Sequence, residues 1–250
     1  MNNYHSPKFK HQRTAFYILL TYIFVFQLSG IIFQIGSLRD FALSLIDVPA
    51  EQKGAALASW WTFIVGIISL IIIAILAIRN KDFFKIYQGQ KATTAQAIGW
   101  GVLGFFFVFL GQTVAATIEG YLGIEAGSEN TANLVDVAKV APIMIITIAI
   151  FGPILEEIIF RRVIFGSLVQ AQGFWISAVI SGVVFAAVHF DFTHILLYTV
   201  CGLIFAYIYH RTKRLLASIV SHILLNTFVL TVNLNIDKII KLQKYLESLQ

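Results

Sequence analysis

Two adjacent carboxylates, Glu156 and Glu157, interrupt a segment that is otherwise apolar enough to cross a membrane, and Arg161 follows them. A charged side chain at bilayer depth costs roughly 2.5–3.5 kcal/mol on insertion scales, so chains keep such groups mostly where they line a polar cavity or hold a partner. On a helix, Glu157 and Arg161 are i,i+4 neighbours in the favourable order, whereas Glu156 points about 100° away. We predict that Arg161 neutralises Glu157 and that Glu156 is free to act as a general base. The ordinary alternative is a helix end at the membrane interface.

The first of two histidines in later apolar segments, His189, shares a helix face with Phe185. The chain is expected to turn at residues 170–173, and Glu156 lies 16 residues before Gln172 while His189 lies 17 residues after it. In an antiparallel hairpin that rises about 1.5 Å per residue, both side chains lie about 24 Å from the turn. The spacing predicts that Glu156 and His189 reach the same depth on neighbouring helices. A histidine at the membrane interface is the alternative.

The second histidine, His222, precedes Asn226 by about one helical turn, so the two side chains face one way. Taken alone, such a pair is often only a helix-packing feature. Burying two carboxylates, an arginine and two histidines in separate places would cost on the order of 10 kcal/mol, which one shared polar cavity avoids. We therefore expect one site. His194, near Asp191 at the turn after His189, is ordinarily a turn residue, with a place at the cavity rim as the alternative.

The rest of the 250-residue chain must hold these groups inside a membrane. The composition is 58% hydrophobic and only 12% charged, whereas soluble domains carry about a quarter charged residues. A stretch of about 20 apolar residues crosses a hydrocarbon core of about 30 Å. We predict an all-α, polytopic membrane helical bundle of about seven transmembrane helices, with the catalytic core formed by the last four. The spans are expected at 15–37, 57–78, 96–118, 140–169, 174–190, 194–210 and 215–235.

The net charge of +5 does not indicate nucleic acid, because the basic residues flank the apolar spans in the positive-inside pattern. This pattern predicts a cytoplasmic N-terminus, and the expected location is a bacterial plasma membrane. The first apolar stretch is too long for a signal-peptide core and is expected to be retained. Four parts are predicted: a cytoplasmic tail, N-terminal transmembrane helices, catalytic transmembrane helices and an amphipathic tail. They cover residues 1–14, 15–139, 140–235 and 236–250.

The three polar segments, in their order, resemble the signature of the CPBP family (CaaX protease and bacteriocin-processing, or Abi) of intramembrane proteases. The resemblance covers about residues 140–235, and the three earlier spans match only as apolar helices. It implies that Glu156 is the catalytic glutamate, that His189 and His222 are the catalytic histidines and that Asn226 is the final polar residue. Eukaryotic members remove the last three residues of prenylated CaaX proteins, and bacterial members are linked to peptide maturation and bacteriocin self-immunity.

The expected reaction is hydrolysis of a peptide bond by an activated water. Glu156 would take the proton of the water and pass it to the leaving amine, while His189, His222 and Asn226 would position the water and stabilise the oxyanion. Glu157, Arg161 and Phe185 would support this set. The alternative is Zn²⁺ held by Glu156, His189 and His222 with an open position for water, although the usual zincin His-Glu-x-x-His is absent.

Two other classes of function compete with a protease. A non-catalytic bacteriocin immunity or binding protein could use the same fold, and a proton-coupled transporter would also bury glutamate and histidine. A transporter would usually show an internal repeat, and none is visible. The expected partners are the lipid bilayer and a peptide or small membrane-protein substrate, with no nucleic acid.

Overall fold

The structure is a computed structural model that describes residues 4–6 and 8–248. Within these residues it is a bundle of helices without a β-sheet, which confirms the predicted all-α membrane architecture. Six helical runs are long and apolar enough to cross a membrane. They are Phe9–Gln34, Ala50–Arg79, Thr94–Tyr121, Ile143–Gln172, Phe192–Thr212 and Leu215–Leu234.

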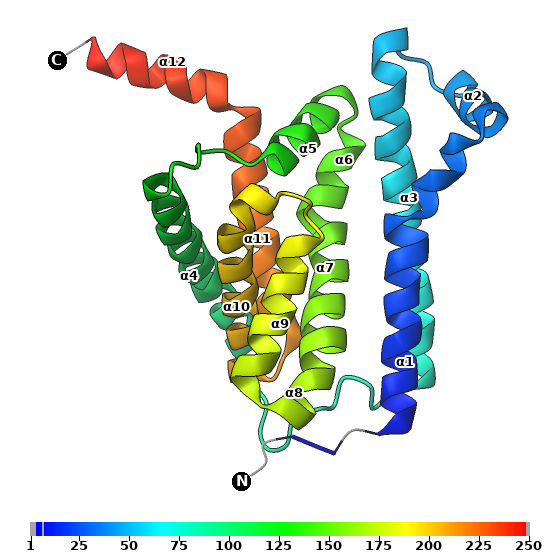
Figure 1. The fold of residues 1–250 in the computed structure, drawn as a ribbon, viewed down its shortest axis with the longest axis vertical. Coiled ribbons are helices and arrows are strands. Elements are labelled where there is room, and N and C mark those ends of the chain that lie inside the picture. The colour runs from blue at the N-terminus through cyan, green and yellow to red at the C-terminus, as the bar shows by residue number, and fades with distance from the viewer. Residues whose placement is uncertain (1–3, 7, 249–250) are drawn as a thin grey trace.

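The predicted count of seven spans is not confirmed, because the expected fifth span is a shorter helix. This helix, α9 (Phe174–Ala187), has only 14 residues. At about 1.5 Å per residue it covers about 21 Å, less than the hydrocarbon thickness. Figure 1 nevertheless shows α9 running along the bundle. The start of α1 (Phe9–Leu20) and the last helix, α12 (Ile236–Glu247), lie at opposite ends of the bundle.

The first three long runs begin near the expected places and contain several helix types. A π-helical stretch and a 3₁₀ stretch continue α1 as far as Gln34, and the remaining helices here are α2 (Gly36–Ser44), α3 (Lys53–Arg79) and α4 (Thr94–Tyr121). The first helix begins at Phe9, within the predicted tail 1–14, of which residues 1–3 and 7 lie outside the described residues. The capping box of Thr93 and Gln96 fixes the start of α4.

The part of the chain predicted to be catalytic contains one long, nearly continuous helical rod. It comprises α6 (Ile143–Ile146), α7 (Gly152–Glu156) and α8 (Gly166–Gln172), joined by π-helical stretches at Thr147–Phe151 and Glu157–Phe165. Pro153 lacks a backbone N–H, so the α-helical pattern cannot run through it unaltered. Such π-helical segments inside α-helices are frequent at functional sites, and here they flank Glu156 on both sides.

The helices α9, α10 (Ile195–Thr212), α11 (Leu215–Leu234) and α4 surround this rod on one side, while α1 and α3 lie on the other (Figure 1). The backbones of α9 and α10 approach closely, since a Cβ added to Gly202 would lie 2.7 Å from the Cα of Gly182. Glycines permit this contact because their lack of a side chain lets two backbones meet. The tight α9–α10 pairing fixes the turn that carries His189 and His194.

A helix that was not predicted from the sequence lies toward the end of the bundle opposite the start of α1 (Figure 1). This helix, α5 (Glu129–Val140), occupies the loop that follows α4, and it contacts α3, α6 and α11. Ser128 caps its start, because the Ser128 hydroxyl accepts a hydrogen bond from the Thr131 N–H at 3.1 Å. In the predicted tail 236–250, α12 is an exposed amphipathic helix, and residues 249–250 lie outside the described residues.

Candidate active site

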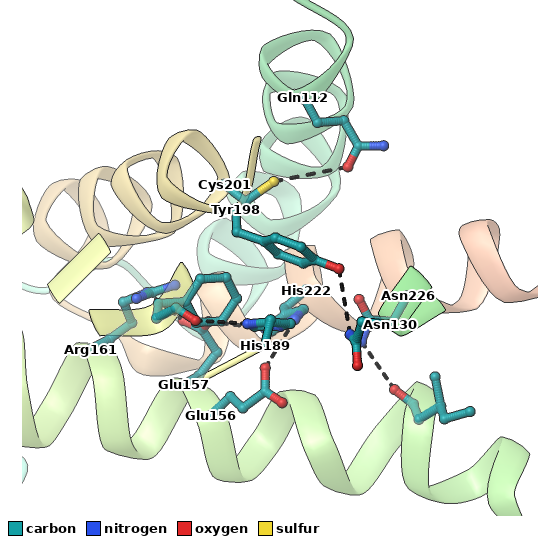
Figure 2. Close-up of polar contacts among 12 residues, drawn as sticks. Gln112, Asn130, Glu156, Glu157, Arg161, His189, Tyr198, Cys201, His222 and Asn226 are labelled. Atoms are coloured by element: carbon teal, nitrogen blue, oxygen red, sulfur yellow. Dashed lines mark hydrogen bonds and ion pairs between the residues drawn. The ribbon is translucent and has the colours of Figure 1, made fainter. Parts of the chain in front are cut away.

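The proposed base, Glu156, is the last residue of α7 and faces His222 of α11. Its Oε2 lies 3.6 Å from Nε2 of His222, and its side chain is 19% exposed. Figure 2 shows the Glu156 carboxylate directed at the two imidazoles of His189 and His222. The structure therefore brings together side chains from three segments that the sequence placed in one site.

The neighbouring Glu157 is buried behind this pair and has two partners. Its Oε2 lies 3.2 Å from Nε of Arg161, and both side chains are fully buried. This distance makes an ion pair, although the orientation is not that of a hydrogen bond. Its other oxygen, Oε1, lies 3.0 Å from Nδ1 of His222. The predicted split between a neutralised Glu157 and an available Glu156 agrees with this geometry, whereas the contact between Glu157 and His222 was not predicted.

The cation of this pair is enclosed by aromatic rings. The guanidinium carbon of Arg161 lies 4.9 Å from the ring centre of Phe185 and 5.3 Å from that of Phe205. An arginine over the face of an aromatic ring is attracted by the ring quadrupole. Phe185 thus supports the site through Arg161, and it also contacts the ring of His189 at 4.7 Å between centroids.

His189 lies just past the end of α9, in the turn rather than within the predicted span 174–190. Its Nδ1 lies 2.7 Å from the carbonyl oxygen of Phe185. A carbonyl can only accept, so Nδ1 carries a proton and Nε2 is the nitrogen left for other partners. On the other side, the ring stacks on Tyr198 with centroids 4.1 Å apart and an interplanar angle of 26°.

Asn226 faces the same cavity, but one of its side-chain N–H groups is already bonded to the backbone. Its Nδ2 donates to the carbonyl oxygen of Ile148 at 3.1 Å, within the π-helical stretch of the rod. One N–H and the amide oxygen remain for a water or a substrate. Asn226 and His222 thus face the same cavity, and Asn226 also bonds to the rod.

All four predicted catalytic residues line one cavity of about 720 Å³. Its wall also includes Tyr22 and Gln27 from the first run of helix, neither of which was predicted to belong to the site. The Gln27 side chain donates to the Tyr22 hydroxyl at 2.9 Å. Glu157 and Arg161 do not line the cavity, and they act from behind it.

The rim of the cavity holds a second polar group, which includes His194. Nδ1 of His194 lies 2.8 Å from Oε2 of Glu119, and Nε2 lies 2.9 Å from the carbonyl oxygen of Gly127. The backbone N–H of Leu197 donates to the other oxygen of Glu119 at 3.1 Å. His194 lines the cavity, as the alternative interpretation expected. Glu119 was missed because it lies in a loop of the sequence-based scheme, far along the chain from its partner.

The alternative of a bound Zn²⁺ requires three converging ligands. Among residues 4–6 and 8–248, no three His, Cys, Asp or Glu side chains are arranged to hold a metal ion. Nδ1 of His189 and of His222 is engaged by Phe185 or Glu157, which leaves the two Nε2 atoms and Glu156 as the three donors that this alternative names, but these do not converge on one point. The side chains as placed do not fit the metal site, and no chemical step is assigned to a metal.

Comparison with known proteins identifies similar membrane peptidases. A model of the family described as type II CAAX prenyl endopeptidase, Rce1-like, matches residues 138–228, a range that contains all four predicted catalytic residues. The chain is 38% identical over 224 residues to "Putative membrane peptidase YdiL" of Bacillus subtilis (strain 168), which covers 89% of this chain and 90% of the relative. It is 35% identical over 170 residues to "Membrane-embedded CAAX protease MroQ" of Staphylococcus aureus (strain USA300), which covers 65% and 69%. No solved structure matches the chain.

Proposed function

This chain belongs to the Rce1-like family of membrane peptidases, and we propose that it is an intramembrane endopeptidase in which Glu156 activates the attacking water. The observation that carries this proposal is the unequal environment of two adjacent carboxylates. Glu156 is 19% exposed and faces a cavity, whereas Glu157 is fully buried beside Arg161. Only the first can reach both a water and a substrate.

The proposed reaction begins with a water held between Glu156 and the histidines. Glu156 accepts a proton while the water oxygen adds to the peptide carbonyl carbon, which becomes a tetrahedral oxyanion. The same carboxyl group then passes the proton to the leaving nitrogen, and the C–N bond breaks to give a carboxylic acid, which then ionises, and an amine. The separation of 3.6 Å between Glu156 and Nε2 of His222 exceeds a direct hydrogen bond and suits a shared water or substrate atom.

The remaining residues would orient the water and stabilise the charge of the oxyanion. Glu157 fixes Nδ1 of His222, so Nε2 points into the cavity and can donate to the oxyanion when it carries a proton. The Phe185 carbonyl fixes Nδ1 of His189, so Nε2 can accept a hydrogen bond from the water. The free N–H of Asn226 would serve as a further donor.

The proposal is tested with Glu156→Gln, which keeps the size of the side chain and removes the base. Purified protein in liposomes is mixed with a pool of synthetic membrane-spanning peptides, and mass spectrometry identifies pairs of complementary products. We expect wild-type protein to cleave and the variant to lose roughly 10²–10⁴-fold in rate, the usual contribution of a general base. Asp136→Asn, at an exposed residue of α5 outside the cavity, is the matched control. Undiminished cleavage by Glu156→Gln would overturn the assignment.

We further propose that the biological role is maturation of a membrane-associated peptide or self-immunity to a bacteriocin, in a bacterial plasma membrane. The two relatives are bacterial proteins named as a membrane peptidase and a CAAX protease, which supports a proteolytic role. A non-catalytic binding protein would protect its host equally well with Glu156→Gln at equal expression. Loss of peptide processing or resistance in that strain is the expected result.

We also propose that the end of the bundle that carries the chain start faces the cytoplasm. The α3–α4 connection lies at this end (Figure 1), and it packs on the α10–α11 turn through the bond from Lys213 Nζ to the Gln88 carbonyl at 2.7 Å. Both connections are rich in lysine and arginine, as positive-inside orientation requires. A reporter fused before α1 should therefore be protected in intact cells.

A further inference from the structure

Every formally charged side chain that lines the cavity is acidic. Among the described residues, no lysine or arginine lines the wall, and the charged ones are Glu119, Glu125, Glu129 and Glu156. The lining is otherwise apolar, apart from uncharged polar groups and the three histidines. A ligand that enters this cavity therefore meets carboxylates and neutral groups, and the one histidine whose two ring nitrogens both face acceptors, His194, is already paired with Glu119, so no free cation in the described wall receives an anion.

The four carboxylates differ in whether a nearby group already balances their negative charge. Glu119 is buried against His194 at 2.8 Å, so its charge has a local partner. Glu125 and Glu129 are exposed at the opening, and within the part of the chain that the structure describes neither has an ion-pair partner. Glu129 lies in the first turn of α5, where a helix start favours an acid, whereas Glu125 has no such local role.

A second observation indicates that the cavity receives polar but uncharged groups. The Thr147 hydroxyl is buried, its residue is only 3% exposed, and it lines the cavity without a hydrogen-bond partner. Buried hydroxyls are normally paired, so an unpaired one in a cavity wall suits a ligand that brings its own donor or acceptor. Side-chain amides of Gln27, Asn226 and Asn233 line the same wall. Peptide groups provide the matching chemistry.

We infer that the cavity binds an uncharged or positively charged internal stretch of a peptide, and that it excludes a free C-terminal carboxylate. This inference rests on the proposed endopeptidase function and names its substrate class. A carboxylate taken from water into this wall would lose its solvation without gaining a cation, and it would face carboxylates of the same sign. A lysine or arginine flanking the bound stretch would instead be drawn toward Glu125 and Glu129 at the opening.

The test uses synthetic peptides of about 20 residues with one shared apolar centre. One pair of pools differs only in lysine or glutamate next to the centre, and a second pair differs only in a C-terminal amide or a free acid placed near the centre. With wild-type protein in liposomes, we expect lysine-flanked peptides to be cleaved about tenfold faster or more than glutamate-flanked ones, and amides faster than free acids. Equal rates within either pair, or removal of short C-terminal fragments from free acids in preference, would overturn the inference.

A second part of the test uses variants to identify the residues that cause the preference for lysine-flanked peptides. The double variant Glu125→Gln with Glu129→Gln should lose most of the preference for lysine, whereas Asp136→Asn should retain it. Asp136 is an acid of the same α5 helix that is paired with Lys139 and does not line the cavity. The preference should also weaken as salt concentration rises, because the rim acids are exposed. A double variant that keeps the full preference contradicts the role of these two residues.

A binding arm separates this inference from the proposed catalysis. The inactive Glu156→Gln protein is titrated in nanodiscs with the same fluorescent lysine- and glutamate-flanked peptides, and anisotropy gives the two dissociation constants. Tighter binding of the lysine-flanked peptide without any cleavage by wild-type protein would preserve the inferred substrate class and refute the peptidase mechanism. Equal binding of the two peptides would refute the substrate class, even if wild-type protein cleaves both.

Discussion

Nδ1 of His222 lies 3.0 Å from Oε1 of Glu157, a carboxylate that is fully buried behind the cavity. The same carboxylate lies 3.2 Å from Arg161, so one side chain joins the cation of the rod to the imidazole of α11. Glu157 therefore determines which nitrogen of His222 points toward Glu156. Although the two glutamates are adjacent in sequence, their surroundings differ: Glu156 faces the cavity, whereas Glu157 holds His222, which lines the cavity.

Replacing Glu157 by Gln should reduce both stability and activity. The change leaves Arg161 buried without its counter-charge, and breaking a buried pair in this way typically costs about 3–5 kcal/mol. His222 would also lose the charged acceptor that holds Nδ1. Thermal unfolding in detergent should show a marked decrease for Glu157→Gln and almost none for Glu156→Gln, while both lose peptidase activity. An unchanged unfolding temperature for Glu157→Gln would contradict the buried pair.

The double variant Glu157→Gln with Arg161→Met separates the two effects. Without the arginine, no uncompensated cation remains in the core, so part of the lost stability should return. Activity should stay low, because His222 still lacks its charged acceptor. If the double variant regains activity together with stability, Glu157 acts only through Arg161 and not through His222.

Tyr198 should position His189 through its ring more than through its hydroxyl. The ring stacks on the imidazole at 4.1 Å, and the hydroxyl lies 2.9 Å from Ser128 Oγ at the start of α5. Aromatic contacts of this kind contribute about 0.5–1.5 kcal/mol. Tyr198→Phe should keep kcat within a few-fold of wild type, whereas Tyr198→Ala should lower kcat by about tenfold or more. Equal kcat values for the two variants would show that the stacking is irrelevant to catalysis.

Gly152 should be required for space beside the base rather than for folding. A Cβ at Gly152 would lie 3.2 Å from the carbonyl oxygen of Thr147 and 3.7 Å from Oε1 of Glu156, within the cavity wall. Alanine is favoured over glycine in helices by about 1 kcal/mol, which offsets the tight contact with the Thr147 carbonyl, so Gly152→Ala should change the unfolding temperature little. The added methyl group should displace water or substrate from Glu156 and reduce kcat. Gly99→Ala is the control, since a Cβ at Gly99 would meet nothing within 4 Å. Full activity of Gly152→Ala would mean that the water binds elsewhere.

Local spacing predicted the parts of the site that depend on one helix or one hairpin. The i,i+4 relation placed Glu157 beside Arg161, and the distance from the turn brought His189 to the depth of Glu156. These relations follow from helical geometry alone. The π-helical stretches around Glu156 and the early end of α9 were not predicted, because both depend on how neighbouring helices pack.

Contacts between segments that are distant in the sequence could not be predicted from the sequence alone. The bond between Glu157 and His222 depends on how α11 packs on the rod, and no spacing in the sequence encodes that packing. The helix α5 was missed because its loop looked merely acidic, although Ser128 before Glu129 is a recognisable helix-capping signal. Tyr22 was missed because a single tyrosine in an apolar span usually serves packing or an interface.

The contacts of His194 with Glu119 and with the Gly127 carbonyl should hold the loop at the cavity rim against the start of α10. Both ring nitrogens of His194 face acceptors, Glu119 at 2.8 Å and the Gly127 carbonyl at 2.9 Å, so both need a proton and the imidazole is charged. Removing either partner leaves a buried group unpaired. In a double-mutant cycle of Glu119→Gln and His194→Gln, the coupling energy should fall at about 1–3 kcal/mol, as expected for neighbours in one network.

The same cycle has a functional readout, because Gly127 lies between the two rim glutamates of the loop. Without the bond from His194, amide hydrogen exchange around Gly127 should quicken, and Glu125 should no longer be held at the opening. Glu119→Gln should therefore lower the preference for lysine-flanked peptides while leaving cleavage of neutral ones within a few-fold of wild type. Asp136→Asn should change neither quantity, since its side chain pairs with Lys139 outside the cavity. Unaltered exchange and an unaltered preference in Glu119→Gln would show that α5 and the loop are held by their apolar contacts alone.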